Sequence, residues 1–295
     1  MNPLALHAMV FLRGTAAADW RHVVDATAAA GFELLEVPLR DPAAVDAGGL
    51  RRLLGAAGLR PVCLLALPFA ADVSSEDSAV VERGERLLLD ALDLAAELGS
   101  PYLGGVIYSA AGRYERPATA AGRASSVSVL RRLSRRAADH RITIGLEVVN
   151  RYETNLINTA EQALELIKEI GRDNVGVHLD TFHMNIEEAD VAAAIEACGD
   201  RLAYFHASES NRGYLGSGSV DFDAGFAALA GIGYDGPIGF ESFTASAAPE
   251  PLVRSMALWR DVWHDPVDLA TQAREFLADG IATARQAVAT SATGG

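Results

Sequence analysis

The chain has 295 residues, of which 50% are hydrophobic and 22% are charged, a composition typical of a globular protein with a substantial core. It carries 25 Lys and Arg against 39 Asp and Glu, which gives a formal net charge of -14 at pH 7. Because this excess of negative charge repels nucleic acids and anionic lipids, the composition argues against partners of either class.

Cys63 and Cys198 lie far apart in apolar surroundings and are expected to be reduced core residues. Two cysteines are too few for a zinc site of the thiolate type. The chain starts without a basic leader or a signal-peptide core, and no run approaches the roughly 20 apolar residues that cross a bilayer. We therefore expect a cytoplasmic protein without membrane contact.

Eight short segments rich in apolar and β-branched residues alternate with longer segments of helical periodicity. This alternation indicates parallel βαβ units. The expected strands are Leu4–Val10, Phe32–Leu39, Arg60–Leu67, Tyr102–Tyr108, Arg141–Val149, Asn174–Asp180, Leu202–Ser208 and Pro237–Phe243. At about 37 residues per unit, they predict the α/β class and a single-domain (β/α)₈ TIM barrel.

The expected helices begin and end at recognisable residues. One is predicted over Ala79–Leu98. Another opens with an N-cap in Asn158-Thr-Ala-Glu161 and closes at Gly171, a residue suited to the left-handed position after a helix. Because no Pro, Gly or Ser-rich linker divides the chain, we expect one barrel over residues 1–289 and a flexible tail over 290–295.

A doubly wound open sheet is the alternative architecture for alternating strands and helices. Its dinucleotide-binding form would carry Gly-Xaa-Gly-Xaa-Xaa-Gly after the first strand. Here the first strand continues into Phe11-Leu-Arg-Gly14 instead. The barrel is therefore favoured over the open sheet.

Each of the last four expected strands carries one residue that binds hard metals, near its C-terminal end. These residues are Glu147, Asp180, His206 and Glu241. They lie 33, 26 and 35 residues apart, each close to one βα unit, so a barrel would bring them together at the face where TIM-barrel active sites lie. The alternate positions on these strands are almost wholly apolar and suit packing against the helices.

Three carboxylates at one point would repel one another unless a cation were bound. We therefore predict one divalent metal ion held by these four residues, and no organic cofactor. Three carboxylates and one imidazole favour Mn²⁺, with Co²⁺ or Mg²⁺ as alternatives. The simpler explanation, separate polar groups at strand ends, leaves unexplained why four of them follow the period of the barrel.

Four stretches around these positions have distinctive sequences. They are Leu146-Glu-Val-Val-Asn-Arg-Tyr-Glu153, Leu179-Asp-Thr-Phe-His-Met-Asn-Ile-Glu-Glu188, Ser210-Asn-Arg-Gly213 after His206, and Gly239-Phe-Glu-Ser-Phe243. They resemble the D-tagatose 3-epimerase family, which includes the D-allulose (D-psicose) and L-ribulose 3-epimerases and lies within the xylose-isomerase-like barrels. The resemblance covers nearly the whole chain and is strongest from about Ile144 to Phe243.

The resemblance implies roles for individual residues. The metal ligands it implies are Glu147, Asp180, His206 and Glu241. Of these, Glu147 and Glu241 would also serve as the acid/base pair.

The resemblance further implies that Glu153, His183 and Arg212 contact the sugar oxygens near C1 to C3. Without the family resemblance, Arg212 is equally consistent with a solvated charged residue in a Gly-rich loop. His183 is equally consistent with a residue that caps a helix. Glu153 equally fits a surface partner for Arg151.

The first half of the chain departs from the family. His7 stands where an aromatic residue is more usual, and Ser109-Ala-Ala-Gly112 lacks the tryptophan of some members. The family places these positions at the far end of the sugar, so they bear on substrate preference. His178 shares a strand face with Asp180, one layer deeper, and either orients a ligand or is an ordinary core histidine. We assign no role to the other histidines.

The expected reaction interconverts unphosphorylated ketoses that differ at C3: D-fructose and D-allulose, D-tagatose and D-sorbose, or L-ribulose and L-xylulose. The metal would chelate O2 and O3 and stabilise the enediolate formed when C3 loses its proton. Carboxylates on opposite faces of C3 would remove and return that proton. The expected partner is this small ketose, and the family implies a homodimer or homotetramer.

Other reactions remain open at this point. Three other reactions begin with removal of a proton beside a carbonyl. They are those of a sugar isomerase with a related barrel, a hydroxypyruvate-type isomerase and an inosose-type dehydratase. A metal-dependent endonuclease would need more histidines and a basic track for DNA. A sugar-binding regulatory barrel would have lost one of the two acid/base residues, and both Glu147 and Glu241 are present.

Overall fold

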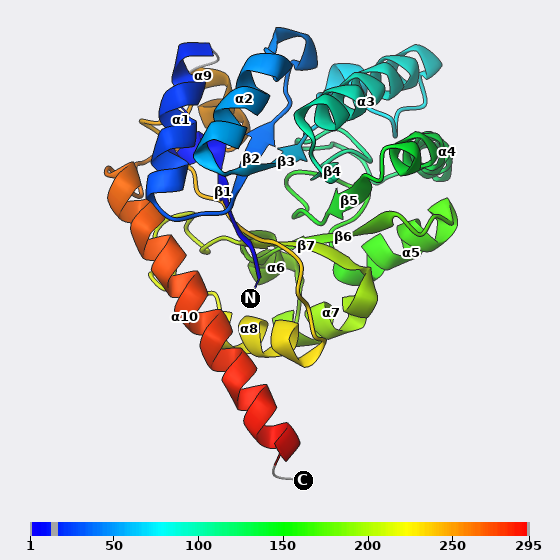
Figure 1. The fold of residues 1–295 in the computed structure, drawn as a ribbon. Helices are drawn as coiled ribbons and strands as arrows, with labels where there is room; N and C mark the ends of the chain where they lie inside the picture. Colours follow the sequence, from blue (N-terminus) through cyan, green and yellow to red (C-terminus); the bar gives the residue numbers. More distant parts are fainter. Residues whose placement is uncertain (1, 13–16, 294–295) are drawn as a thin grey trace.

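Eight parallel strands close into a barrel in the computed structural model of the chain, which describes residues 2–12 and 17–293 (Figure 1). Neighbouring strands pair in chain order, and β8 closes the barrel against β1. The strands are β1 (Leu4–His7), β2 (Leu34–Pro38), β3 (Arg60–Leu64), β4 (Tyr102–Gly105), β5 (Thr143–Glu147), β6 (Val175–Asp180), β7 (Leu202–Ala207) and β8 (Ile238–Phe240). The predicted TIM barrel is confirmed, and the open sheet is wrong.

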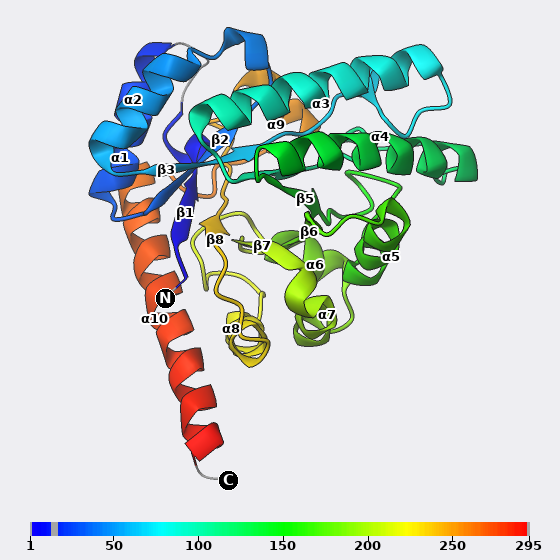
Figure 2. The same ribbon diagram turned by 45° about the vertical axis from the view of Figure 1, so that its right-hand side comes forward.

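Helices surround the barrel on its outside (Figures 1 and 2). The α-helices are α1 (Ala17–Ala29), α2 (Ala47–Ala57), α3 (Ser78–Leu98), α4 (Ala120–Asp139), α5 (Ala160–Ile170), α6 (Thr181–Glu187), α7 (Val191–Cys198), α8 (Phe222–Gly231), α9 (Glu250–Ser255) and α10 (Pro266–Thr293). Four short 3₁₀ helices are η1 (Ala8–Val10), η2 (Pro42–Ala44), η3 (Phe69–Ala71) and η4 (Gly199–Arg201).

Helix α10 extends along the barrel and projects beyond it at its C-terminal end (Figure 2). It is helical as far as Thr293, past residue 290, where a flexible tail was expected to begin. Residues 294 and 295 lie outside the described part of the chain, so the tail stays a prediction. No helix in the described ranges combines the length and the apolar character needed to span a membrane.

The predicted helix ends are confirmed where the sequence carried capping residues. The side chain of Thr159 accepts a hydrogen bond from the Gln162 amide at the start of α5. Gly171 follows α5 with a φ of 66°, in the left-handed region. The cap donors and acceptors are therefore satisfied locally, which is why a short stretch of sequence predicts them.

The strands are shorter than the sequence predicted, although all eight are present. The first was expected to reach Val10 but ends at His7, where η1 begins. The residues of η1 are as deeply buried as those of β1. Because hydrophobic runs continue from the strands into buried loops, hydrophobicity alone does not mark where strand pairing stops.

Apolar side chains form two separate layers. The larger one lies between the strands and the helices and includes Leu146, Leu179, Phe205 and Phe240, so the predicted helix-facing positions are confirmed. A small cluster fills the barrel interior. It contains Ala5, Leu34, Val62, Leu64, Tyr102 and Tyr204. Cys63 and Cys198 are buried and free, as expected.

The end of β4 depends on a residue without a side chain. Gly105 has a φ of 109°, in the region that residues with a Cβ rarely adopt. A Cβ at this position would also collide with the backbone carbonyl oxygen of Leu65 on β3's continuation. Neither obstacle can be relieved by rotating a side chain.

We expect Gly105→Ala to lower the free energy of unfolding by roughly 1–3 kcal/mol, because the backbone must strain or move. Gly55→Ala in α2 is the matched control, since its Cβ would meet nothing within 4 Å. Alanine in that exposed helix should raise stability by about 0.5–1 kcal/mol. Urea unfolding of both variants measures the difference; a Gly105→Ala protein as stable as the wild type would contradict this account.

Candidate active site

The C-terminal ends of β5 to β8 bring the four predicted ligand residues to one buried point. Glu147 ends β5, Asp180 ends β6, His206 is the next-to-last residue of β7, and Glu241 directly follows β8. One ligand atom from each lies within 4.8 Å of the others. The structure therefore gathers these residues as the spacing predicts, and the group could hold one metal ion.

The orientation of His206 fits a metal ligand. Its Nδ1 atom lies 3.6 Å from Glu147 Oε1 and 3.6 Å from Asp180 Oδ2, and it makes no hydrogen bond within the described residues. Its other ring nitrogen, Nε2, lies 3.0 Å from Glu36 Oε1. A carboxylate on the far nitrogen would fix the ring and its tautomer, leaving Nδ1 available to a cation.

Glu36, in β2, was missed by the sequence analysis. It is fully buried, and besides the contact with His206 it accepts a hydrogen bond of 2.6 Å from the Tyr204 hydroxyl. Burial raises the pKa of Glu36, but the neighbouring His206 outweighs this effect and holds the pKa below its usual value. The available signal was a lone carboxylate inside an otherwise apolar strand, Leu34–Pro38.

A glycine on β8 makes room for this pair. A Cβ at Gly239 would collide with Glu36 Oε1 and would lie 2.7 Å from the imidazole of His206. Gly239 therefore allows the His206 and Glu36 side chains to meet in the barrel interior.

Arg212 is buried among the carboxylates, so the alternative of a solvated charge is wrong. Its Nη1 atom donates to Glu241 Oε2 at 2.7 Å and to Asp180 Oδ2 at 3.1 Å. Its guanidinium also lies over the Phe182 ring, 4.0 Å from the centroid. The cation offsets part of the negative charge of the cluster.

The two carboxylates that Arg212 contacts differ in proton affinity. Burial raises the pKa of Glu241 to about 8, and Arg212 and His206 oppose this only in part. Burial also raises the pKa of Asp180, but there Arg212 and the contact with His206 outweigh it and hold the pKa well below its usual range. Of the two carboxylates, Glu241 therefore binds a proton more readily.

Glu153 and His183 lie beside this group. The Asn150 side-chain amide donates to Glu153 Oε1 at 3.1 Å and lies 2.8 Å from His183 Nδ1. His183 Nε2 lies 3.3 Å from an Arg212 nitrogen. The structure thus brings the three predicted sugar-contact residues together.

The two simpler explanations for these residues are wrong. Arg151 pairs with Glu187 at 2.7 Å, and not with Glu153. His183 lies inside α6 and does not cap it; the cap is the Asp180 carboxylate, which accepts a 2.7 Å hydrogen bond from the Phe182 amide.

His178 packs as a core residue. Its ring meets that of His206 edge-to-face, with 4.3 Å between centroids. Neither of its ring nitrogens has a hydrogen-bond partner in the described part of the chain. Glu36, and not His178, is therefore the residue positioned to orient His206.

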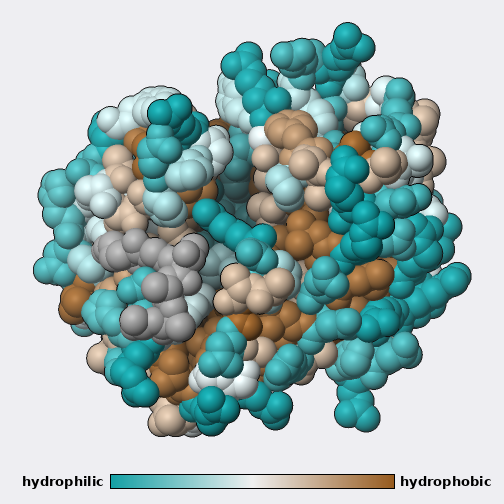
Figure 3. Space-filling model, turned by 90° about the horizontal axis from the view of Figure 1, so that it is seen from above, coloured by the Kyte–Doolittle hydropathy of each residue, from teal (hydrophilic) through white to brown (hydrophobic). Residues whose placement is uncertain are grey.

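A cavity of about 470 Å³, within the usual range for small-molecule sites, is lined by two of the four clustered residues, Glu147 and Glu241. Its walls include Glu147, Glu153, His183, Arg212 and Glu241. Leu252 and Met256, in and after α9, also line it. Figure 3 looks down on this end of the barrel, where hydrophobic surface in the middle of the face is bordered by hydrophilic residues.

His7 is one of the residues at which the sequence departs from the family. It lines this cavity, and its Nε2 atom lies 3.7 Å from Glu241 Oε1. Burial lowers the pKa of His7 to about 4, so the ring is neutral at pH 7. Its place at the far end of the sugar, which the resemblance implies, stays a prediction.

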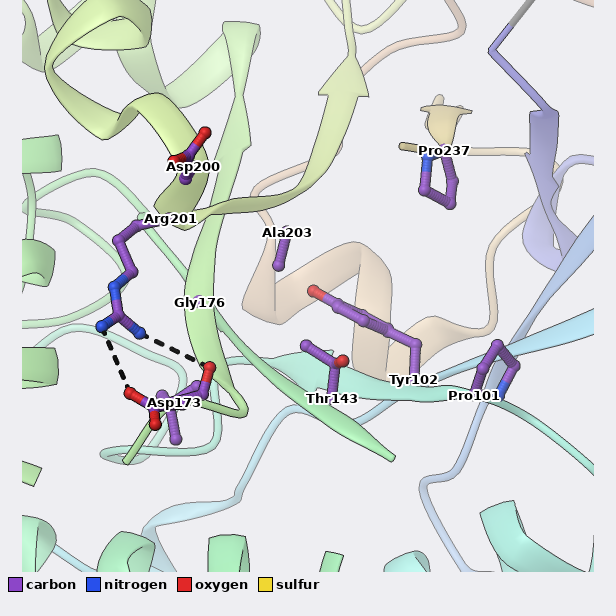
Figure 4. Close-up of a pocket in the computed structure, with 10 residues that line it drawn as sticks. Pro101, Tyr102, Thr143, Asp173, Gly176, Asp200, Arg201, Ala203 and Pro237 are labelled. Atoms are coloured by element: carbon purple, nitrogen blue, oxygen red, sulfur yellow. Dashed lines mark hydrogen bonds and ion pairs between the residues drawn. The ribbon is translucent and has the colours of Figure 1, made fainter. Parts of the chain in front are cut away.

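A second cavity, of about 390 Å³, lies at the opposite end of the barrel, where the strands begin (Figure 4). Tyr102, Thr143 and Ala203 line it, and Arg201 forms an ion pair with Asp173 at its edge. None of the predicted site residues lies there. The candidate active site is therefore the cavity at the C-terminal ends of the strands, as in other TIM barrels.

Comparison with known proteins assigns this chain to a family. A family model described as a xylose isomerase-like TIM barrel matches residues 24–262. A ketose 3-epimerase from Arthrobacter globiformis is 48% identical over 276 residues, which cover 94% of this chain and 96% of that protein. The chain belongs to the ketose 3-epimerases of this barrel family. It is thus an enzyme of the isomerase class, and the resemblance found in the sequence is confirmed.

Solved structures agree with this assignment. D-allulose 3-epimerase from Methylomonas sp., in complex with D-allulose, superposes with a TM-score of 0.93 at 45% identity, over 94% of this ketose 3-epimerase and 96% of that chain. An L-ribulose 3-epimerase superposes with a TM-score of 0.96 at 38% identity, over 98% of both chains.

The contact between Glu36 and His206 leads to a prediction about metal binding. We expect Glu36→Gln to weaken Mn²⁺ binding by roughly 10- to 100-fold, because the amide holds the imidazole less firmly and with a weaker acceptor. Isothermal titration calorimetry measures the affinity, with exposed Glu82→Gln on α3 as the control. Equal affinity in Glu36→Gln and the wild type would show that Glu36 does not support the ligand.

Proposed function

We propose that this enzyme is a metal-dependent 3-epimerase of unphosphorylated ketoses. The observation that carries the proposal is the gathering of Glu147, Glu241, Asp180 and His206, of which Glu147 and Glu241 line a cavity of about 470 Å³. Family membership adds the substrate class. The D-allulose complex of the Methylomonas enzyme favours the D-fructose and D-allulose pair, and relatives that are L-ribulose 3-epimerases make L-ribulose a second substrate to test.

The donor set supports a hard divalent ion at this point. Glu147, Asp180, His206 and Glu241 would hold it, with Mn²⁺ as the preferred ion and Co²⁺ or Mg²⁺ as alternatives. When bound, such an ion supplies Lewis-acid stabilisation of the negative charge that develops on the substrate oxygens.

Inversion at C3 needs a base on one side of the carbon and an acid on the other. Glu147 and Glu241 come from β5 and from the residue after β8, with two strands between them, so they enter the cavity from different directions. One carboxylate removes the C3 proton and leaves a planar enediolate. The other carboxyl group returns a proton to the opposite face, and the roles exchange in the reverse reaction.

Arg212, His183 and Glu153 keep the sugar in place during this exchange. Arg212 and His183 offer nitrogen atoms 3.3 Å apart to the oxygens at C1 and C2. Glu153, held by Asn150, offers an acceptor next to them. Fixing these oxygens prevents the planar intermediate from rotating between the two proton transfers.

Incubation with D-fructose, D-tagatose or L-ribulose and Mn²⁺ in D₂O tests the function. We expect the C3 epimer of at least one sugar, with deuterium at C3, and no product from EDTA-treated protein until Mn²⁺ is restored. Chiral chromatography and NMR identify product and label. Deuterium at C1 with an aldose product would favour an isomerase, and loss of water would favour a dehydratase.

Substitution of the two carboxylates tests the acid/base pair. Glu147→Gln and Glu241→Gln should each reduce kcat by about 10²-fold to 10⁴-fold, because the amide neither removes nor returns a proton. Metal content is measured for each variant, since both residues belong to the ligand group. The control is Glu161→Gln at the exposed start of α5. Wild-type turnover in either variant would remove that residue from the pair.

Two further expectations have no direct support in the fold. The cytoplasmic location and the assembly into a homodimer or homotetramer stay predictions from the sequence.

A further inference from the structure

Glu209 carries a fully buried carboxylate that neither belongs to the ligand group nor lines the cavity. It lies in the loop between β7 and α8. Its Oε1 atom accepts hydrogen bonds from the Ser210 amide at 2.7 Å, from the Ser210 hydroxyl at 2.9 Å and from the Val220 amide at 3.3 Å. Its Oε2 atom accepts from the Gly216 amide at 2.9 Å. Because these donors are neutral and belong to one loop, the carboxylate holds that loop folded around itself.

The loop passes so close to the carboxylate that a side chain would not fit. A Cβ at Gly218 would lie 2.3 Å from Glu209 Oε1 and 2.3 Å from Ser210 Oγ. Ser210 Oγ accepts in turn from the Ser219 amide at 2.9 Å. This fold needs an acceptor at both oxygens of Glu209. A glutamine would bring an NH₂ group toward one of the N–H donors.

The same loop carries Arg212, whose backbone is held on both sides. The Arg212 amide donates to the carbonyl oxygen of Glu209 at 2.8 Å. The Arg212 carbonyl oxygen accepts a hydrogen bond from the Ser242 hydroxyl, and the Trp263 indole donates to Ser242 Oγ at 2.8 Å. The left-handed φ of 60° at Arg212 is therefore fixed by contacts within the loop and with the segment after β8. The place of the guanidinium depends on the fold of this loop.

We propose that Glu209 is a positioning residue, whose carboxylate holds the loop between β7 and α8 in the fold that presents Arg212 to the sugar. The inference rests on the proposed function, in which Arg212 contacts the oxygens at C1 and C2. Glu209 acts through Arg212, because its own side chain is absent from the cavity wall. A small displacement of a group that orients the substrate is costly to the rate.

The test measures kcat and KM on whichever of D-fructose, D-tagatose and L-ribulose the wild type converts fastest. Glu209→Gln keeps the size of the side chain and removes its charge. The matched control is Glu33→Gln, because Glu33 also accepts from a backbone amide, that of Leu4 at 2.9 Å, but lies where the strands begin. Both changes are repeated in Arg212→Met protein, with kcat/KM taken from epimer accumulated over long incubations.

We expect Glu209→Gln to lower kcat/KM about tenfold, and Glu33→Gln to leave it unchanged. In Arg212→Met protein the same change at Glu209 should cost less than about twofold, since the group through which it acts is gone. Mn²⁺ affinity, measured by isothermal titration calorimetry, should not fall in Glu209→Gln. The ligand group is intact there, and a displaced guanidinium repels the ion less.

Ser210→Ala is a milder second variant, because it removes the Ser210 hydroxyl that donates to Glu209 and leaves the amide donors in place. It should lower kcat/KM about threefold, again only when Arg212 is present. Thermal unfolding shows which variants are folded, and Ser210→Ala decides the question if Glu209→Gln is not.

Wild-type kcat/KM in the folded variants would overturn the inference. An equal loss with and without Arg212 would also overturn it, because Glu209 would then act by another route. Weaker Mn²⁺ binding in Glu209→Gln would do the same, since the ligand group itself would have been disturbed. Wild-type protein that forms no C3 epimer from any of the three sugars would instead overturn the proposed function.

Discussion

The burial of three carboxylates around one imidazole is the constraint on which the rest of the site depends. Glu147, Asp180 and Glu241 point at the same small volume as His206, and carboxylates in such a place repel one another unless positive charge is close. Arg212 supplies part of that charge. It does so from a backbone φ of 60°, a conformation that costs a non-glycine residue of order 1–3 kcal/mol. The strain is tolerated because it places the guanidinium between two carboxylates.

Residues deeper in the barrel hold His206 in place. Glu36 reaches His206 from β2, with β1 and β8 between it and β7, and the Tyr204 hydroxyl donates to Glu36 in turn. Gly239 leaves the space in which these side chains meet. The interior thus passes from the small apolar cluster through Tyr204 and Glu36 to His206, so the imidazole is held by hydrogen-bonding groups deeper in the barrel.

The proposed roles are divided unevenly between the two halves of the barrel. The proposed acid/base pair and the residues proposed to contact the carbonyl end of the sugar come from β5 to β8 and the loops after them, whereas segments that follow the first four strands line the rest of the cavity. The departures from the family, His7 and Ser109-Ala-Ala-Gly112, fall in that first half. Glu36 and His7 also come from this first half and lie beside His206 and Glu241, so substitutions of these two residues also affect the ligand group.

The barrel, the helix caps and the four clustered residues could be predicted from the sequence. Strand alternation and capping are local, and one ligand per βα unit repeats along the chain, so a single pattern carries all four. The contacts of Glu36 and His7 became visible only in the folded barrel. Glu36 meets His206 from 170 positions away, and His7 meets Glu241 only because β8 closes against β1. Such contacts leave no periodic pattern in the sequence, since they depend on how distant parts of the chain meet when the barrel closes.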